Sequence, residues 1–309
     1  MSDIVISEFM DEAAVQTLKP DFEVTFDPTL VEDRERLLES GRGVRALIVR
    51  NRTQVDQALL ARFPDLQVVG RLGVGLDNID LEACREANVT VMPAHGGNTV
   101  AVAEYVIAAV LLLRRGAYLS TSRVIAGEWP RQAMMGHETQ GATLGLVGFG
   151  AIARDVARRA RCLGMHVVAH DPFLAQDDQA WNEAERVASL DELLPKVDAL
   201  SLHVPLTDGT RHLIDREALS RMKPGSVVIN TARGGTVDES ALAESLKAGH
   251  LGGAMLDVFE HEPLAQGSIL AGVEGLVATP HIAGVTHESN QRISWITVDN
   301  VRRALGGVA

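Results

Sequence analysis

Three charged side chains in the last third of the sequence could perform acid–base chemistry on an anionic substrate. Arg233 lies in NTARGGTVDE, Glu262 in DVFEHEP and His281 in TPHIAG, each after an apolar run. A guanidinium binds a carboxylate through its planar fork, and an imidazole exchanges protons near neutral pH. A carboxylate beside the imidazole would stabilise its protonated form. Together the three groups suit proton-coupled hydride transfer on a charged hydroxy or oxo acid.

A glycine-rich turn upstream of these residues predicts a dinucleotide site. In TLGLVGFGAIARDVARRA, an apolar run leads into Gly148 and Gly150, and a stretch of helical period follows. The first glycine permits a tight turn, the second lets the backbone approach a pyrophosphate, and Ala153 occupies the third, small position. The helix that follows would offer free N–H groups to the phosphates. The alternative is an ordinary glycine turn between a strand and a helix.

The choice of dinucleotide depends on Asp171, which ends the next apolar run, MHVVAHD. A carboxylate about 20 residues beyond the glycines accepts hydrogen bonds from the adenosine ribose and repels a 2′-phosphate. The residues that follow, Pro172, Phe173 and Leu174, offer no compensating cation. We therefore expect NAD rather than NADP.

The composition restricts the class of protein and its partners. A net charge of −12 argues against binding to nucleic acid or to anionic membranes, which need a basic surface. The most apolar stretch, Tyr105–Leu113, is too short to span a bilayer, and the N-terminus lacks the features of a signal peptide. We expect a cytoplasmic protein with a small-molecule partner. No metal site is expected, because His137-Glu138 lacks the second histidine of a zinc helix.

The pattern along the chain predicts an α/β fold of two Rossmann-like or flavodoxin-like parallel-sheet domains with a cleft between them. Apolar runs alternate with stretches of helical period in two successive series, as in parallel sheets with crossover helices. A helical pattern from about Val100 to Gly127 divides the series, and its apolar first half indicates a junction or the contact of a homodimer. Residues 1–98 with 285–309 are predicted to form a discontinuous substrate-binding domain, and residues 99–284 an NAD-binding domain.

Seven segments, taken in order, resemble the D-2-hydroxyacid dehydrogenases. They are RLGVGLDNID (71–80), VAEY (102–105), GLVGFGAIA (145–153), LHVPLTDGTRHLI (202–214), NTARGGTVDESAL (230–242), MLDVFEHEP (255–263) and TPHIAG (279–284). The resemblance implies an NAD-dependent oxidoreductase that interconverts a D-2-hydroxy acid and its 2-oxo acid. It also implies a homodimer.

The same resemblance assigns roles to individual residues. His281 would be the general acid and base, Glu262 its partner, and Arg233 the group that binds the substrate carboxylate. Val74 and Gly75 would offer backbone N–H groups to that carboxylate. The residues implied along the cofactor are Gly148, Gly150, Ala151, Ile152, Asp171, Val204, Thr231, Ala232, Arg233, Asp257, His281 and Gly284. Of these, Ala151 and Ile152 would lie at the pyrophosphate and Asp257 at the carboxamide.

Three arginines near predicted strand ends give a hint about the substrate. Arg50, Arg52 and Arg71 would suit a second anionic group on the hydroxy acid, as in 3-phosphoglycerate or 3-sulfolactate. The alternative is that some of them are solvated surface residues. Two other functions stay open on the sequence alone. They are an NADPH-dependent glyoxylate or hydroxypyruvate reductase, and a non-enzymatic NAD-sensing interaction protein.

Overall fold

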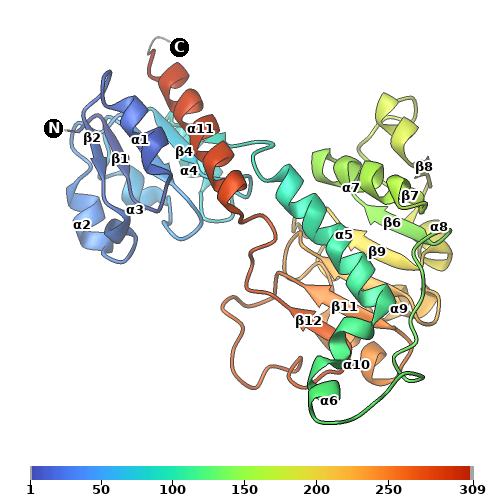
Figure 1. The fold of residues 1–309 in the computed structure, drawn as a ribbon. Helices are drawn as coiled ribbons and strands as arrows, with labels where there is room; N and C mark the ends of the chain where they lie inside the picture. The colour runs from blue at the N-terminus through green and yellow to red at the C-terminus, as the bar shows by residue number, and fades with distance from the viewer. Residues whose placement is uncertain (1, 307–309) are drawn as a thin grey trace. The chain divides into compact units, whose positions relative to one another are not determined.

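Two parallel β-sheets, one of five strands and one of seven, organise residues 2–306, which the computed structural model describes. They belong to two units (Figure 1). Unit 1 comprises the chain up to Asn98 together with the segment from Val285 onward, and unit 2 is Thr99–Gly284. The predicted fold class, two parallel-sheet α/β domains, is confirmed.

Unit 1 carries its five parallel strands in the order β2-β1-β3-β4-β5. The strands are β1 (Ile4–Ile6), β2 (Val24–Phe26), β3 (Ala46–Val49), β4 (Val68–Arg71) and β5 (Thr90–Pro93). Successive residues of a strand point to opposite faces, so Ala46 and Ile48 join one core cluster while Leu47 and Val49 join the other.

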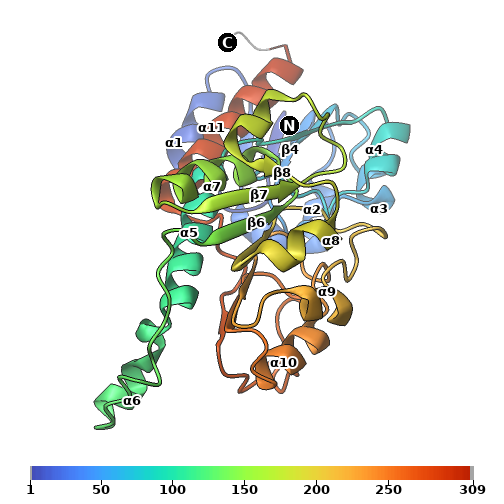
Figure 2. The ribbon, with the colours of Figure 1, turned by 90° about the vertical axis from the view of Figure 1, so that its right-hand side faces the viewer.

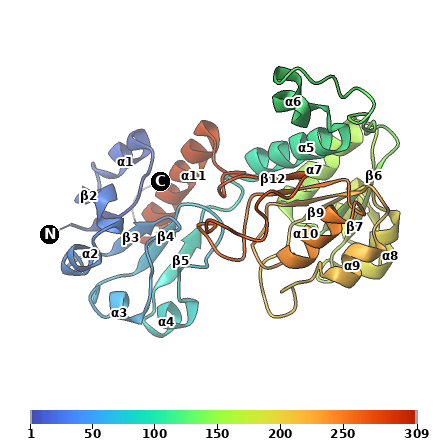
Figure 3. The ribbon, with the colours of Figure 1, turned by 90° about the horizontal axis from the view of Figure 1, so that it is seen from below.

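Five α-helices cover the two faces of the unit 1 sheet, as Figure 3 shows. Helices α1 (Glu12–Leu18) and α11 (His287–Ala304) contribute to one cluster, and the others pack on the opposite face. Those others are α2 (Arg34–Glu39), α3 (Gln57–Leu60) and α4 (Leu81–Glu86), with a 3-10 turn η1 (Pro28–Val31) before α2. The helical tail predicted from the sequence therefore packs on the sheet built by the beginning of the chain.

Unit 2 has the strand order β12-β11-β10-β9-β6-β7-β8. The strands are β6 (Thr143–Val147), β7 (His166–His170), β8 (Glu185–Arg186), β9 (Ala199–Leu202), β10 (Val227–Asn230), β11 (Gly253–Leu256) and β12 (Leu276–Ala278). After β6 the chain continues to β7 on one side and later to β9 on the other. In open parallel sheets, ligands bind at the carboxyl ends of the strands where the order reverses in this way.

Two layers of helices cover the unit 2 sheet (Figure 2). On one face lie α5 (Thr99–Arg115) and α7 (Ala151–Cys162), and on the other α8 (Leu190–Leu193), α9 (Arg216–Arg221) and α10 (Glu239–Lys247). The connections contain α6 (Thr121–Ile125) and three 3-10 turns, η2 (Ala117–Ser120), η3 (Gln179–Glu183) and η4 (Leu194–Lys196). Within residues 2–306, no helix combines the length and the apolar character that crossing a membrane requires.

One sequence prediction about the helices was wrong. The helical pattern from Val100 to Gly127 predicted one continuous helix, but α5 ends at Arg115. Gly116 then adopts a left-handed φ of 65°, which starts η2 instead of another helical turn. The side-chain pattern continues beyond this position, so the break follows from the backbone of a single glycine.

Candidate active site

The cofactor residues predicted from the sequence all lie at one edge of the unit 2 sheet. They follow β6 (Gly148, Gly150, Ala151, Ile152), β7 (Asp171), β9 (Val204), β10 (Thr231, Ala232, Arg233), β11 (Asp257) and β12 (His281, Gly284). Parallel strands present their carboxyl ends at the same edge. The fold therefore gathers residues from six connections of the chain.

The turn after β6 has the geometry that a dinucleotide pyrophosphate needs. Gly148 has a φ of 85°, and a Cβ there would lie 2.6 Å from the carbonyl oxygen of His203, so a larger residue does not fit. Gly150 is the N-cap of α7 and makes no side-chain cap, and among the described residues other than Gly150 and its two chain neighbours no heavy atom lies within 4 Å of its Cβ position. A phosphate therefore has room beside Gly150, and free N–H groups at a helix N-terminus attract such an anion.

Asp171 ties the end of β7 to this glycine turn. Its Oδ2 accepts a hydrogen bond from the Phe149 amide at 2.8 Å, and its Oδ1 accepts one from the Phe173 amide at 2.9 Å. A carboxylate oxygen accepts more than one hydrogen bond. Asp171 therefore keeps the capacity to accept a ribose hydroxyl while both backbone contacts hold it in place.

The loop after β10 carries Thr231 and Arg233, and Asn230 shapes it. The Asn230 Oδ1 accepts from the Ala232 amide at 3.0 Å, and its Nδ2 donates to the Arg233 carbonyl at 2.9 Å. Within the described residues, the Thr231 hydroxyl is buried without a hydrogen-bond partner. An unsatisfied buried hydroxyl at this edge suits a polar group of a bound cofactor. Sequence reasoning missed Asn230, although a polar residue ending a buried apolar strand was a signal.

Gly234 places the Arg233 loop against the segment before Glu262. A Cβ on Gly234 would overlap the carbonyl group of Phe259, so the two backbones are in direct contact.

We expect Gly234→Ala to lower kcat/KM roughly 100-fold, because a displacement of about 1 Å in a catalytic group costs that much. Steady-state kinetics test this, with circular dichroism to show that the variant is folded. Gly209→Ala is the matched control, because a Cβ there meets no atom closer than 3.9 Å, and unchanged kinetics in both variants would contradict the prediction.

His281 and Glu262 form a hydrogen-bonded pair. The Nδ1 of His281 lies 2.7 Å from the Oε2 of Glu262, whose Oε1 accepts from the Phe259 amide at 3.0 Å. A carboxylate only accepts hydrogen bonds, so the Nδ1 carries the proton and the Nε2 is left for exchange with a substrate. The His281 side chain is about half exposed, so a ligand can reach it.

Asp257 organises the loop that carries His281. Its buried carboxylate accepts hydrogen bonds from the Thr279 hydroxyl at 2.6 Å and from the amides of Ile282 and Ala283, both at 2.8 Å. The Thr279 hydroxyl in turn lies 2.5 Å from the hydroxyl of Tyr105, whose pKa is raised by burial. Sequence reasoning missed this link between α5 and the histidine loop. The predicted contact of Asp257 with a nicotinamide carboxamide stays a prediction.

In unit 1, Arg71 and Arg50 lie at the ends of neighbouring strands. The Arg71 guanidinium folds over Gly73 and donates to the carbonyl of Leu72 at 2.8 Å, beside the turn that carries Val74 and Gly75. Arg50 donates to the Oδ1 of Asn290 at 2.6 Å. Both side chains are only partly exposed. The carboxyl ends of β3 and β4 therefore carry two guanidiniums, together with the buried carboxylate of Glu8, which accepts from the Arg50 amide at 2.8 Å.

Arg52 has a different environment. Its guanidinium pairs with both carboxylate oxygens of Glu32, at 2.6 and 2.9 Å, and the pair is exposed. Because Glu32 neutralises the charge of Arg52, the structure gives no support to the anion-binding role predicted for Arg52.

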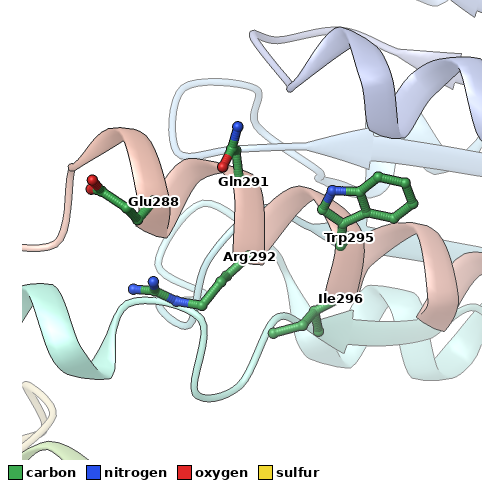
Figure 4. Close-up of a pocket in the computed structure, with 5 residues that line it drawn as sticks. All are labelled: Glu288, Gln291, Arg292, Trp295 and Ile296. Carbon is green, nitrogen blue, oxygen red and sulfur yellow. The ribbon is translucent and has the colours of Figure 1, made fainter.

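A shallow hollow on unit 1 lies along the exposed side of α11 (Figure 4). It is lined by Glu288, Gln291, Arg292, Trp295 and Ile296, and none of the residues predicted to do chemistry is among them. Arg292 donates from its Nε to the carbonyl of Gly97 at 3.0 Å, which holds the HGG segment before α5 against the helix. Its role in this structure is therefore to fix a loop.

His203 lies next to Val204 at the end of β9. We expect its side chain to contribute to the stability of the fold at neutral pH and to lose that contribution in acid. Burial lowers its pKa to about 4, and its Nε2 contacts the Ser201 hydroxyl at 3.0 Å. A folded-state pKa below the unfolded value of about 6.5 means that the contribution is complete above pH 6.5 and is lost as the pH falls toward 4. Over that pH range the free energy of unfolding should fall by up to about 3 kcal/mol more in the wild type than in His203→Asn. Urea unfolding at pH 7 and at pH 4.5 measures the difference, and parallel losses in the two proteins would contradict it.

Comparison with known proteins gives the family. Residues 107–283 match the model of the D-isomer specific 2-hydroxyacid dehydrogenase NAD-binding domain. The chain is 75% identical over 306 residues to an (S)-sulfolactate dehydrogenase of Chromohalobacter salexigens, covering 99% of both chains. It is 35% identical to a D-3-phosphoglycerate dehydrogenase of Methanocaldococcus jannaschii, of which it spans 58%.

A solved structure extends the likeness to the whole fold. The D-lactate dehydrogenase of Aquifex aeolicus, complexed with NAD and lactic acid, is 29% identical, with a TM-score of 0.84 over 98% of this chain and 95% of that one. The matched range, residues 107–283, contains the glycine turn, Asp171 and the histidine–glutamate pair of unit 2. The chain belongs to the D-isomer specific 2-hydroxyacid dehydrogenase family and is an NAD-dependent oxidoreductase.

Proposed function

We propose that the protein interconverts a D-2-hydroxy acid that carries a second anionic group, such as 3-sulfolactate, and its 2-oxo acid. The observation that carries the proposal is the 2.7 Å contact between His281 and Glu262, at the sheet edge that also holds the glycine turn. In this assignment unit 2 binds the cofactor and unit 1 contributes to substrate binding.

The residues at the unit 2 edge fit NAD. The open N-terminus of α7 would hold the pyrophosphate, Asp171 the adenosine ribose, and the loop with the unsatisfied Thr231 hydroxyl the nicotinamide half. Bound NAD supplies the acceptor for the hydride that leaves C2 of the hydroxy acid. An assay of NAD against NADP tests the assignment of Asp171, because its carboxylate repels a 2′-phosphate.

His281 and Arg233 would act on the substrate itself. During oxidation the Nε2 of His281 takes the hydroxyl proton while the hydride leaves C2, and during reduction it returns that proton to the new alkoxide oxygen. Glu262 stabilises the imidazolium that forms. Arg233 binds the carboxylate through two parallel N–H bonds. Unit 1 would contribute the backbone N–H groups of Val74 and Gly75.

The second anionic group is proposed to bind at Arg71 and Arg50. Both guanidiniums are partly withdrawn from solvent at adjacent strand ends, where hydrogen bonds to an anion are stronger than at an exposed site. The enzyme that is 75% identical over nearly the whole chain is named for (S)-sulfolactate. The phosphoglycerate dehydrogenase is more distant and much longer than the matched region. We therefore favour a sulfonate over a phosphate.

The descriptor (S) agrees with a D-specific family. In lactate the carboxylate outranks the methyl group, and the D isomer is (R). In sulfolactate the CH₂ group carries sulfur, which outranks the carboxylate oxygens, so the same spatial arrangement is written (S). The name of the similar enzyme and the name of the family thus describe one orientation of the C2 hydrogen.

A substrate panel with arginine variants tests the substrate class. We expect Arg71→Gln and Arg50→Gln to lower kcat/KM for 3-sulfolactate by roughly 10- to 100-fold, as for the loss of a hydrogen bond to a charged group. The kcat/KM for lactate should stay unchanged in both variants. Arg52→Gln is the matched control, because Glu32 already neutralises that side chain. Equal losses for both acids would contradict the proposed anion site.

A homodimer that forms through the segment after α5 is also proposed. Large apolar side chains stand exposed on this segment, which extends beyond the end of α5 in Figure 2: Tyr118, Leu119, Val124, Ile125, Trp129 and Met135. Several large apolar side chains exposed along one segment are typical of a protein interface. Light scattering at micromolar concentration should give twice the chain mass, and Ile125→Arg should lower it. A monomeric wild type would contradict the dimer.

The need for NAD is in keeping with the cytoplasmic location expected from the sequence.

A further inference from the structure

An indole ring backs the glycine turn of unit 2. Trp181, on the 3-10 turn η3, stacks on Phe149 with the ring centroids 5.1 Å apart and the planes inclined by 6°. Phe149 is the residue between the two glycines, and its ring is almost completely buried. The position of the turn therefore depends on the surface that Trp181 offers to its central side chain.

Trp181 is itself held from several directions. Its Nε1 donates to the carbonyl of Ala175 at 2.8 Å. The guanidinium of Arg186 lies over its ring, 5.8 Å from the centroid. The carbonyl of the next residue, Asn182, accepts from Arg161 of α7 at 3.0 Å. The indole is thus fixed between α7, β8 and the loop after β7.

The loop after β7, residues 171–178, is attached to the glycine turn at two points. At its beginning, Asp171 accepts from the Phe149 amide at 2.8 Å. At its middle, the Ala175 carbonyl accepts from Trp181, whose ring stacks on Phe149. Both attachments lead to the same residue. A shift of the indole would therefore move the ribose-binding carboxylate relative to the pyrophosphate-binding turn.

We propose that Trp181 is a positioning residue for the adenosine half of NAD. It sets the spacing between the Gly148–Gly150 turn and Asp171 and touches neither the substrate nor the reacting atoms. The inference rests on the proposed cofactor site and adds to it a residue outside the glycine motif. Its consequence is that loss of the indole weakens the adenosine contacts and leaves the chemical step intact.

The test uses Trp181→Phe and Trp181→Ala in the full-length enzyme. Phenylalanine keeps a ring on Phe149 but cannot donate to Ala175, so we expect the KM for NADH and the Ki of AMP to rise together by roughly 3- to 10-fold. Alanine removes both contacts, and we expect a larger rise. The value of kcat at saturating NADH and the KM for the oxo acid should stay within twofold of the wild type.

Two control variants separate the possible failures. Trp295→Phe changes a tryptophan on the exposed side of α11 in unit 1 and should leave all four parameters unchanged. Asp171→Ala should raise the Ki of AMP whether or not Trp181 matters. If Asp171→Ala weakens AMP binding and Trp181→Phe does not, the positioning role is wrong and the cofactor site stands. If neither variant weakens AMP binding, the ribose assignment of Asp171 is wrong, and the positioning role fails with it.

A purely structural role for Trp181 would give a different pattern. The unfolding temperature would fall in both Trp181 variants while the KM for NADH and the Ki of AMP stayed constant. A rise in the KM for NADH with an unchanged Ki of AMP would place the effect on the nicotinamide half. Either result would overturn the proposal. If the alanine variant does not fold, the measurements on Trp181→Phe alone decide the question.

Discussion

Replacing His281 by asparagine is expected to lower kcat for reduction of the 2-oxo acid by roughly 10³-fold, in the range of a lost general acid. Asparagine retains a side chain that can hydrogen-bond to Glu262 but cannot deliver a proton to the oxygen on C2. The dissociation constant for NADH should stay within a few-fold of the wild type. Stopped-flow measurement of NADH oxidation at saturating cofactor and oxo acid gives the value.

A second histidine–glutamate pair in unit 2 provides the matched control. The Nε2 of His212 lies 3.0 Å from the Oε1 of Glu260, and neither residue is assigned a role in the chemistry. His212→Asn should therefore keep kcat within twofold of the wild type. The assignment of His281 would be wrong if His281→Asn kept more than a tenth of the wild-type kcat.

Replacing Arg233 by alanine is expected to lower kcat/KM for the oxo acid by roughly 10³-fold. This corresponds to the 2 to 5 kcal/mol lost when one partner of a desolvated charge pair is removed. Arg233→Lys keeps the charge but loses the planar fork, so it should recover only part of the activity. The Ki of oxalate, which presents carboxylates without a reacting centre, should rise in parallel, and the dissociation constant for NADH should change much less.

The control for Arg233 is Arg216→Ala, which removes a guanidinium that pairs with Glu244 on the surface of unit 2. Its kinetics should match those of the wild type. If the Ki of oxalate is the same in Arg233→Ala as in the wild type, the substrate carboxylate binds elsewhere and the assignment of Arg233 is wrong.

The strands that build both sheets follow from short apolar runs in the sequence. Runs such as ALIV and VVIN are buried on both sides, as the strands of parallel sheets covered by helices are. The edge strand β8 was missed because it consists of Glu185 and Arg186, with no apolar pattern at all. The extent of α5 was overestimated because the apolar spacing runs past Gly116, where a left-handed backbone ends the helix.

The candidate site was only partly accessible from the sequence. His281 and Glu262 stand in motifs whose residue types predict acid–base chemistry, and the structure brings their side chains into contact. Tyr105 and Thr279, in contrast, are 174 residues apart, and only the fold shows that their hydroxyls meet. The same holds for the stacking of Trp181 on Phe149. Contacts of this kind depend on tertiary packing, for which one sequence carries no local signal.

The most direct test of the account follows the hydrogen on C2 of the substrate. The wild-type enzyme is incubated with NAD and (S)-3-sulfolactate that carries deuterium at C2, and the NADH formed is analysed by mass spectrometry. The account predicts one deuterium in every NADH and one 3-sulfopyruvate formed for each. Unlabelled NADH with deuterium released to water, or no turnover of this acid where plain lactate is oxidised, would contradict it.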